Sequence, residues 1–180
     1  MMDKNIEKKI ITSGKYEDVI EIKDHYYLIS KKQQVVVMPY IIDAKGLLDK
    51  IGVIKDYNYV FEKYDYTLLN DYINQDDGTN LVAANRILYN AIKINIKDAT
   101  EWMYLGNLYN TLTSDSPISL YCVNLTDVEI PKFESSEMKK ESIDFKMVNS
   151  SIVITSDDTL LLASYLRLFN YFYVNSLQKD

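Results

Sequence analysis

The stretch LVAANRILYNAIKI, residues 81–94, says more about the fold than any other part of the chain. Its apolar residues recur at steps of three and four, which is the spacing of one face of an α-helix. They are Leu81, Ala84, Leu88 and Ala91. Thr79 or Asn80 can cap the first turn by accepting a hydrogen bond from a backbone N–H. The stretch therefore predicts an amphipathic helix with one buried side.

Apolar runs on both sides of this helix predict strands. The strongest is QVVVMPYII, residues 34–42, whose unbroken β-branched run is typical of a central strand buried on both faces. Pro39 has no N–H to donate, so this strand should bulge or lose pairing there. Residues 43–46 have turn chemistry and are expected to join it in a hairpin to a returning strand. Strands are also expected at residues 25–30, 47–55, 102–109, 118–125 and 148–155, the last centred on 152–154.

The order of the remaining segments indicates an α/β sandwich. Residues 65–80 are polar and predict irregular structure with a turn at 76–78. A final helix is expected from about residue 159 to 177, capped by Ser156, Asp157 or Asp158. Strands, a helix, further strands and a helix favour a layered α/β domain. Residues 1–22 are expected to form an N-terminal arm, and residues 23–180 a single domain.

The composition argues against several classes of protein. The net charge of −6 and the pI near 4.9 disfavour a general nucleic-acid binder, which needs clustered basic residues. The first residues lack the long apolar core of a signal peptide, and the final helix is too short and interrupted to span a membrane. Cys122 is the only cysteine and lies in an apolar run, which predicts a buried structural thiol.

Several local pieces resemble members of the Nudix hydrolase superfamily. Residues 35–43, VVVMPYIID, are similar to the strand that enters the family's core, and residues 83–86, AANR, to the alanine pair and arginine of the Nudix helix. Residues 101–108, EWMYLGNL, resemble the strand after that helix, and residues 151–168 the closing strand and last helix. The resemblance implies a Nudix-like α/β/α sandwich, with a mixed sheet between helices.

The glutamates that bind metal in this family are missing from the stretch that resembles the Nudix helix. With Arg86 as the anchor, the family's three glutamates fall on Ile87, Asn90 and Ala91, and residues 81–96 contain no Asp or Glu. Steps of three and four place these positions on one helix face, where carboxylates can hold Mg²⁺ or Mn²⁺ against a pyrophosphate. Only Asn90 offers an oxygen, and it is neutral. The resemblance therefore implies a degenerate member with no catalytic residues, no metal and no cofactor.

Other candidate site residues have simpler explanations. The spacing of Asp71, Asp76 and Asp77 fits no standard calcium loop. Acidic side chains just before a helix interact favourably with the positive end of its dipole, so a capping turn explains them better than a metal site. His25, the lone histidine, lies at a predicted strand edge beside charged residues and is expected to be solvated. Adjacent aspartates at 157–158 are better explained as a helix cap than as an acid–base pair.

The final helix carries the candidate interaction residues. Its polar residues Ser164, Arg167 and Asn170 fall three apart and form a single narrow stripe. A helix that covers only its own sheet should have a wider polar face. Two interpretations stay open: a second surface covers the helix, or its tyrosines lie at the rim of the core. The candidates for protein interaction are Tyr165, Tyr171, Phe172 and Tyr173.

The leading hypothesis is a catalytically inactive Nudix-like domain, acting as a structural or protein-interaction module in a larger assembly such as a bacteriophage virion. Its partners would be other proteins, including further copies of the chain, and not nucleic acid or a membrane. It would be cytoplasmic or virion-associated. The surfaces would be the final helix, the loop at residues 110–117 and the charged region at residues 132–146.

Two alternatives keep more of the ancestral site. One is a divergent phosphohydrolase acting on nucleoside diphosphate derivatives, with metal ligands recruited from other acidic residues. These would be Asp71, Asp76, Asp77 or Glu101. The other is a nucleotide-sensing domain without catalysis, in which Arg86 and Tyr89 contact phosphate and base.

Overall fold

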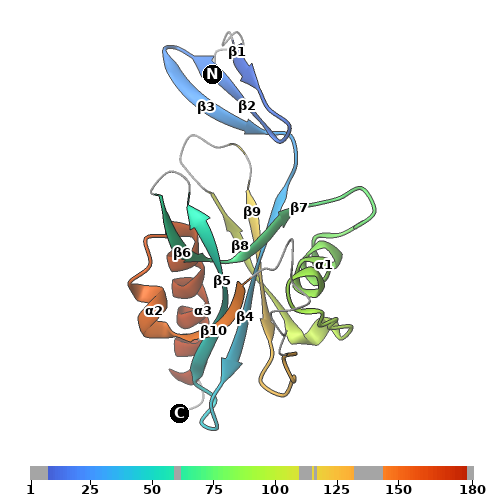
Figure 1. The fold of residues 1–180 in the computed structure, drawn as a ribbon, viewed down its shortest axis with the longest axis vertical. Helices are drawn as coiled ribbons and strands as arrows, with labels where there is room; N and C mark the ends of the chain where they lie inside the picture. Colours follow the sequence, from blue (N-terminus) through green and yellow to red (C-terminus); the bar gives the residue numbers. More distant parts are fainter. Residues whose placement is uncertain (1–7, 59–61, 110–114, 116, 132–143, 178–180) are drawn as a thin grey trace.

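The computed structural model describes residues 8–58, 62–109, 115, 117–131 and 144–177, with side chains described as far as residue 174. A sheet of seven strands lies between α1 (Asn80–Ile92) on one face and α2 (Ser150–Ile154) and α3 (Thr159–Leu177) on the other (Figure 1). A smaller sheet of three strands stands at one end of this body. The expected α/β/α sandwich with a mixed sheet between helices is confirmed.

The small sheet consists of β1 (Lys9–Ser13), β2 (Glu17–Ile22) and β3 (His25–Ser30). The large sheet has the order β10-β5-β4-β9-β8, with β6 beside β5 and β7 beside β4. Its strands are β4 (Gln34–Ile42), β5 (Leu48–Asn58), β6 (Lys63–Thr67), β7 (Leu69–Tyr72), β8 (Trp102–Leu108), β9 (Ile118–Asn124) and β10 (Asp144–Asn149). A single 3-10 turn, η1 (Ala99–Glu101), precedes β8.

Strand β4 is the central strand that its sequence predicts. Alternate side chains enter the two layers of the core: Val36 and Met38 lie on the side of α2 and α3, and Val35 and Val37 on the side of α1. All four of these side chains are fully buried. An unbroken apolar run is stable here because each face of the strand is covered by a layer of helix.

Pro39 lies where β4 changes its partner along one edge. Residues 34–37 pair antiparallel with β7, whereas residues 40–42 pair with β5, and the parallel pairing with β9 continues along the other edge. The expected loss of pairing at Pro39 is therefore confirmed. Gly52 leaves room at this point, because an added Cβ would come within 2.9 Å of the Pro39 Cβ and 2.8 Å of the Phe145 ring.

The N-terminal strands extend across the boundary expected between an arm and a domain. The division between residues 22 and 23 falls within the hairpin of β2 and β3, where Ile22 pairs with His25. Lys23 and Asp24 have φ of 49° and 64°, as the two central residues of a tight hairpin turn require. Tyr16, just before β2, stacks on Tyr72 of β7 with ring centroids 4.5 Å apart, so the small sheet touches the body.

The prediction of a strand at residues 148–155 is wrong. The strand is β10, which ends at Asn149, and residues 150–154 form helix α2. The run of Ile152, Val153 and Ile154 has strand propensity, but only Val153 is buried, and the two isoleucines are 38% and 59% exposed. Edge pairing to β5 is already supplied by residues 144–149, so the tertiary structure overrides the local preference.

Residues 65–80 were predicted to be irregular, but they contain β7 and the end of β6. Leu68 and Leu69 are buried while their neighbours are polar, so only a short apolar core anchors these two strands. The turn predicted at residues 76–78 is present, with Gly78 at φ 67°.

Helix α3 has the predicted bounds, and Asp158 is the cap among the three residues expected to supply it. The Asp158 Oδ1 accepts hydrogen bonds from the backbone N–H groups of Leu160 at 2.8 Å and Leu161 at 3.0 Å. Asp158 N–H in turn donates to Ser156 Oγ at 3.1 Å. Within the described part of the chain, no helix is long and apolar enough to cross a membrane.

Ser164 on α3 should destabilise the fold. Its side chain is fully buried, and its Oγ has no hydrogen-bond partner among the residues that the structure describes. Because a buried hydroxyl without a partner opposes folding, Ser164→Ala should raise the free energy of unfolding by about 1 kcal/mol in urea titrations. Ser156→Ala is the matched control and should lower it, since Ser156 Oγ is bonded to Asp158 and Tyr66. A Ser164→Ala variant less stable than the parent would contradict this account.

Candidate functional site

Helix α1 forms one wall of the groove in which the family resemblance places a metal site. Thr79 caps it, with its hydroxyl accepting from Val82 N–H at 3.2 Å. Lys93 ends it in the left-handed conformation, with its N–H donating to Tyr89 O at 2.8 Å. The expected amphipathic helix is confirmed, and the buried residues are Ala83, Ala84, Ile87, Leu88, Ala91 and Ile92.

The three positions aligned with the family's glutamates lie together in this groove. Ile87 and Ala91 are 5% and 8% exposed and belong to the core layer under α1. They line, with Asn90, a cavity of about 170 Å³ whose other walls are β5 and β7. The remaining lining residues are Ile54, Leu69, Asn70 and Asp71. The floor is therefore apolar, and one carboxylate and two amides supply the polar atoms.

Arg86 clamps α1 to the segment that precedes it. Its Nε and Nη2 donate to both oxygens of Asp77, at 2.8 and 2.9 Å. Its Nη1 donates to Asp71 Oδ2 at 2.7 Å, and its Nη2 also reaches the carbonyl of Tyr72 at 2.9 Å. Asp77 is 5% exposed and accepts a further bond from Asn74 N–H. One guanidinium thus joins β7, the turn and the helix.

The electrostatics of this clamp keep both partners charged. Hydrogen bonding by Arg86 lowers the pKa of Asp77, against the opposing effect of burial. The same bond to Asp77 raises the pKa of Arg86 above its usual range. The Arg86 charge is therefore more than offset by Asp77 and Asp71, and its guanidinium is already occupied by these two carboxylates.

The structure does not assemble the metal ligands proposed for a divergent enzyme. Asp71 and Asp77 are bound to Arg86, Asp76 is exposed in the turn, and Glu101 is exposed at the end of η1. In the residues that the structure describes, no three or more His, Cys, Asp or Glu side chains are grouped so that they could hold a metal ion. For nucleotide sensing, Arg86 is likewise occupied, whereas Tyr89 is 48% exposed, with Lys93 Nζ 5.4 Å from its ring centroid.

The interaction candidates on α3 are divided between core and surface. Tyr165 is 6% exposed and belongs to the core, so its selection as a surface residue is corrected. Phe172 is partly buried and packs edge-on against Tyr40, with ring centroids 5.4 Å apart. Tyr171 and Tyr173 are 42% and 55% exposed. The polar stripe does not mark the outer face, because Ser164 is buried.

Helix α3 exposes further apolar residues that the sequence-based selection left out, Leu166 and Phe169 among them. Leu166 is 59% exposed and Phe169 is 48% exposed. The signal was available in their spacing with Tyr173, since residues three and four apart share a helix face. It could not be used without knowing which side of this largely apolar helix faces the sheet.

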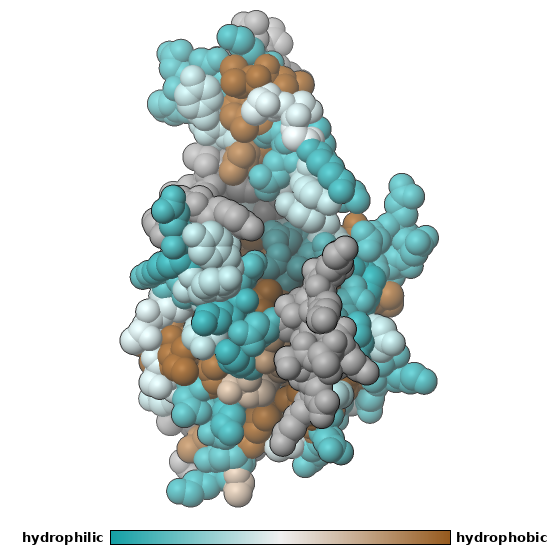
Figure 2. Space-filling model, in the orientation of Figure 1, coloured by the Kyte–Doolittle hydropathy of each residue, from teal (hydrophilic) through white to brown (hydrophobic). Residues whose placement is uncertain are grey.

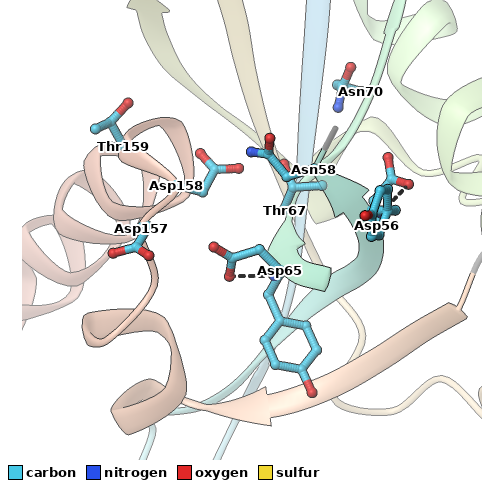
Figure 3. Close-up of a pocket in the computed structure, with 10 residues that line it drawn as sticks. Asp56, Asn58, Asp65, Thr67, Asn70, Asp157, Asp158 and Thr159 are labelled. Atoms are coloured by element: carbon cyan, nitrogen blue, oxygen red, sulfur yellow. Dashed lines mark hydrogen bonds between the residues drawn. The ribbon is translucent and has the colours of Figure 1, made fainter. Parts of the chain in front are cut away.

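A second hollow lies between β5, β6 and the start of α3, with a volume of about 420 Å³ (Figure 3). Its lining residues are Asp56, Tyr57, Asn58, Asp65, Tyr66, Thr67, Asn70, Asp157, Asp158 and Thr159. Lys63 forms ion pairs with Asp157 and with Asp65. The sequence could not indicate this acidic hollow, because its residues come from segments far apart in the chain.

The remaining sequence candidates contribute no chemistry to either hollow. Cys122 is fully buried in β9, and burial raises the pKa of its thiol well above the usual range. His25 is exposed at the start of β3. Of the proposed surfaces at 110–117 and 132–146, only residues 115, 117 and 144–146 lie within the described part of the chain.

Solved structures share this architecture at low sequence identity. An ADP compounds hydrolase matches with a TM-score of 0.65 and 12% identity, over 94% of this chain and 93% of that chain. The fold is Nudix-like. A chain from the crystal structure of the complex between the C-terminal domain of mouse MUTYH and human PCNA matches with a TM-score of 0.54 and 8% identity, over 78% of this chain and 89% of that chain.

A MutT/nudix family protein from Enterococcus faecalis matches with a TM-score of 0.49 and 10% identity, over 66% of this chain and 43% of that chain. No protein-family model and no curated protein sequence matches the chain. At these identities the likeness shows the Nudix-like fold alone.

The Arg86 clamp should stabilise the protein in a pH-dependent way. Arg86→Ala should lower the free energy of unfolding by about 2 kcal/mol at neutral pH, since it leaves the buried Asp77 carboxylate without its charged partner. Because the folded-state pKa of Asp77 is lowered, this stabilisation is complete above the unfolded pKa of about 3.9 and is lost as the pH falls below it. Urea unfolding of both proteins across the acidic range measures the difference.

The control for this prediction is Asp76→Asn, which removes an exposed carboxylate from the same turn and should leave both stability and its pH dependence unchanged. A stability difference between Arg86→Ala and the parent that persists at the lowest pH would show that the clamp does not act through the Asp77 charge.

Proposed function

We propose that this chain is a catalytically inactive Nudix-like domain that acts as a protein-interaction module in a larger assembly. The observation that carries the proposal is the lining of the α1 groove, where Ile87 and Ala91 are buried at two of the three positions that the family resemblance assigns to glutamates. Divalent cations need several oxygen ligands, and the third position supplies only the neutral amide of Asn90.

The residue replacements fit a structural use of the helix. Ile87 and Ala91 extend the apolar face of α1 into the core layer that it shares with β4 and β9. Carboxylates at these buried positions would need charged partners, since an unpaired ion in the core opposes folding strongly. The only carboxylate in the cavity lining, Asp71, is already paired with Arg86. The groove is therefore better suited to packing than to binding a cation.

Surface composition supports a role in binding proteins. The small N-terminal sheet exposes Ile10 at 64%, Ile11 at 44% and Tyr26 at 62%, and Figure 2 shows apolar side chains gathered on that end of the molecule. Helix α3 exposes a second apolar group of residues. Exposed apolar side chains that gather on one part of a surface are typical of interaction sites.

The fold is compatible with either an enzyme or an interaction module. One similar structure is a hydrolase of ADP compounds, and another similar chain comes from a complex of two proteins, the C-terminal domain of mouse MUTYH and PCNA. The latter supports an interaction role for a domain of this shape. We extend the proposal to a virion component of a bacteriophage, the setting that the sequence first suggested.

The second candidate function is a divergent phosphohydrolase, favoured by the oxygens of Asp71 and Asn90 in the groove. A phosphate-release assay on a panel of ADP compounds and other nucleoside diphosphate derivatives, with Mg²⁺ or Mn²⁺, separates the two. We expect no release above a protein-free blank. Metal-dependent release that Asp71→Asn abolishes and that the control Asp24→Asn, at an exposed turn of the small sheet, retains would establish the enzyme instead.

The interaction role is tested by isolating the protein in its native complex, followed by mass spectrometry of the members. We expect stoichiometric partner chains, since an interaction module functions only within its assembly. The proposal is wrong if the protein isolated from its native extract is bound neither to another copy of itself nor to any other chain.

A further inference from the structure

Among the residues that the structure describes, helix α3 has one apolar face buried in the core and further apolar side chains that are largely exposed. The buried face contains Leu161, Tyr165 and Leu168, which belong to the core under the large sheet. The next side around the helix exposes Leu166 at 59%, Phe169 at 48% and Tyr173 at 55% of their surface. Since α3 lies on the outside of the molecule, on the sheet face away from α1 (Figure 1), this second face points into solvent.

The exposed residues form a continuous ridge along the helix. With the half-buried Leu162, the residues Leu166, Phe169 and Tyr173 follow steps of four, three and four. This is the spacing of the seam by which one helix packs along another. The rings of Phe169 and Tyr173 are stacked, with an interplanar angle of 9° and centroids 6.4 Å apart. Two residues of the ridge are thus already in contact with each other before any partner binds.

A groove lies between α3 and β8, and Asn170 in its wall follows Leu166 of the ridge by one helical turn. It has a volume of about 440 Å³ and is lined by Leu105, Arg167, Asn170, Tyr171 and Val174. Ridges of one helix surface pack into grooves of another. A surface that carries both elements side by side can therefore pack against a copy of itself, with each ridge entering the other's groove.

The charge of the helix permits such self-packing. Arg167 is the only charged residue among residues 159–177. Its Nη1 donates to the carbonyls of Leu105 at 3.1 Å and Asn107 at 2.7 Å, which holds the guanidinium against β8. Although the chain has a net charge of −6, two α3 faces would meet without opposed acidic groups. The ridge residues are uncharged, so they offer no ion pairs to a charged partner.

The size of the surface fits the centre of a dimer interface. An aromatic side chain buries about 150–250 Å² when fully covered. Phe169, Tyr171 and Tyr173 are each about half exposed, so with Leu166 and Val174 they offer roughly 400–500 Å² of apolar surface per chain. A stable interface covers about 800 Å² per partner around such an apolar centre.

We propose that this face of α3 is the interface between two copies of the chain, whose helices pack antiparallel about a two-fold axis near Phe169. The proposal deepens the interaction role proposed above and depends on it. A two-fold axis makes the interface self-complementary, so ridge and groove on one copy meet groove and ridge on the other. The partner is thereby defined as a second copy of this chain.

Sedimentation velocity over a range of micromolar concentrations tests the proposal. We expect the parent protein to sediment at twice its chain mass of 21.0 kDa. Leu166→Glu combined with Phe169→Glu places charges on the ridge and should raise the dimer dissociation constant by about 100-fold or more. Leu47→Glu is the matched control, because Leu47 is 52% exposed in the turn between β4 and β5, and it should leave the dimer intact.

Circular dichroism and thermal unfolding of each variant confirm that the chain remains folded, as expected for substitutions at exposed positions. A parent protein that stays at 21.0 kDa throughout, or a folded double variant that dimerises as tightly as Leu47→Glu, overturns the proposal. A different protein on this face would also leave the isolated parent monomeric. A monomeric parent protein would not change the result of the phosphate-release assay or the recovery of other partner chains. The dimer proposal and the broader interaction role are therefore tested independently.

Discussion

Strand β4 must bury both of its faces, and the layers of the molecule are arranged around that requirement. A strand with apolar side chains on both sides is stable only where a second layer covers each of them. Helices α2 and α3 supply one cover, and α1 supplies the other. Pro39 adds a local constraint, because its missing N–H falls where β4 exchanges β7 for β5 along one edge. Gly52 provides the space beside the proline ring.

The same requirement explains the groove beside α1. The helix has to present an apolar face to Val35 and Val37 of β4, and Ile87 and Ala91 enlarge that face. Arg86 then fixes the position of the helix by holding Asp77 and Asp71 from the preceding segment. Each of these features stabilises a scaffold. Arg86 offsets one of these two aspartate charges and is fully occupied by the pair. The small sheet and α3 expose apolar side chains on other parts of the molecule.

Local signals in the sequence were sufficient for the elements that combine strong periodicity with clear ends. Strand β4, its hairpin with β5, and the helices α1 and α3 were predicted. Thr79 and Asp158 were among the residues expected to cap the two helices. Strands β6 and β7 were missed because most of their residues are polar and only Leu68 and Leu69 are anchored in the core. At residues 150–154 the local preference for a strand was overruled, since β10 had already taken the place beside β5.

The sequence by itself determined the layered α/β fold and the absence of acidic residues from α1, because both depend on residue types at fixed spacing along the chain. Only the tertiary structure decided which side of α3 is covered, placed Tyr165 in the core and left Leu166 and Phe169 exposed. Only the folded chain joined Arg86 to Asp71 and Asp77. The physical reason is that a helix with apolar residues on nearly every side has no internal preference for one face. The sheet against which it packs makes that choice, and the face left over is the surface available to a partner.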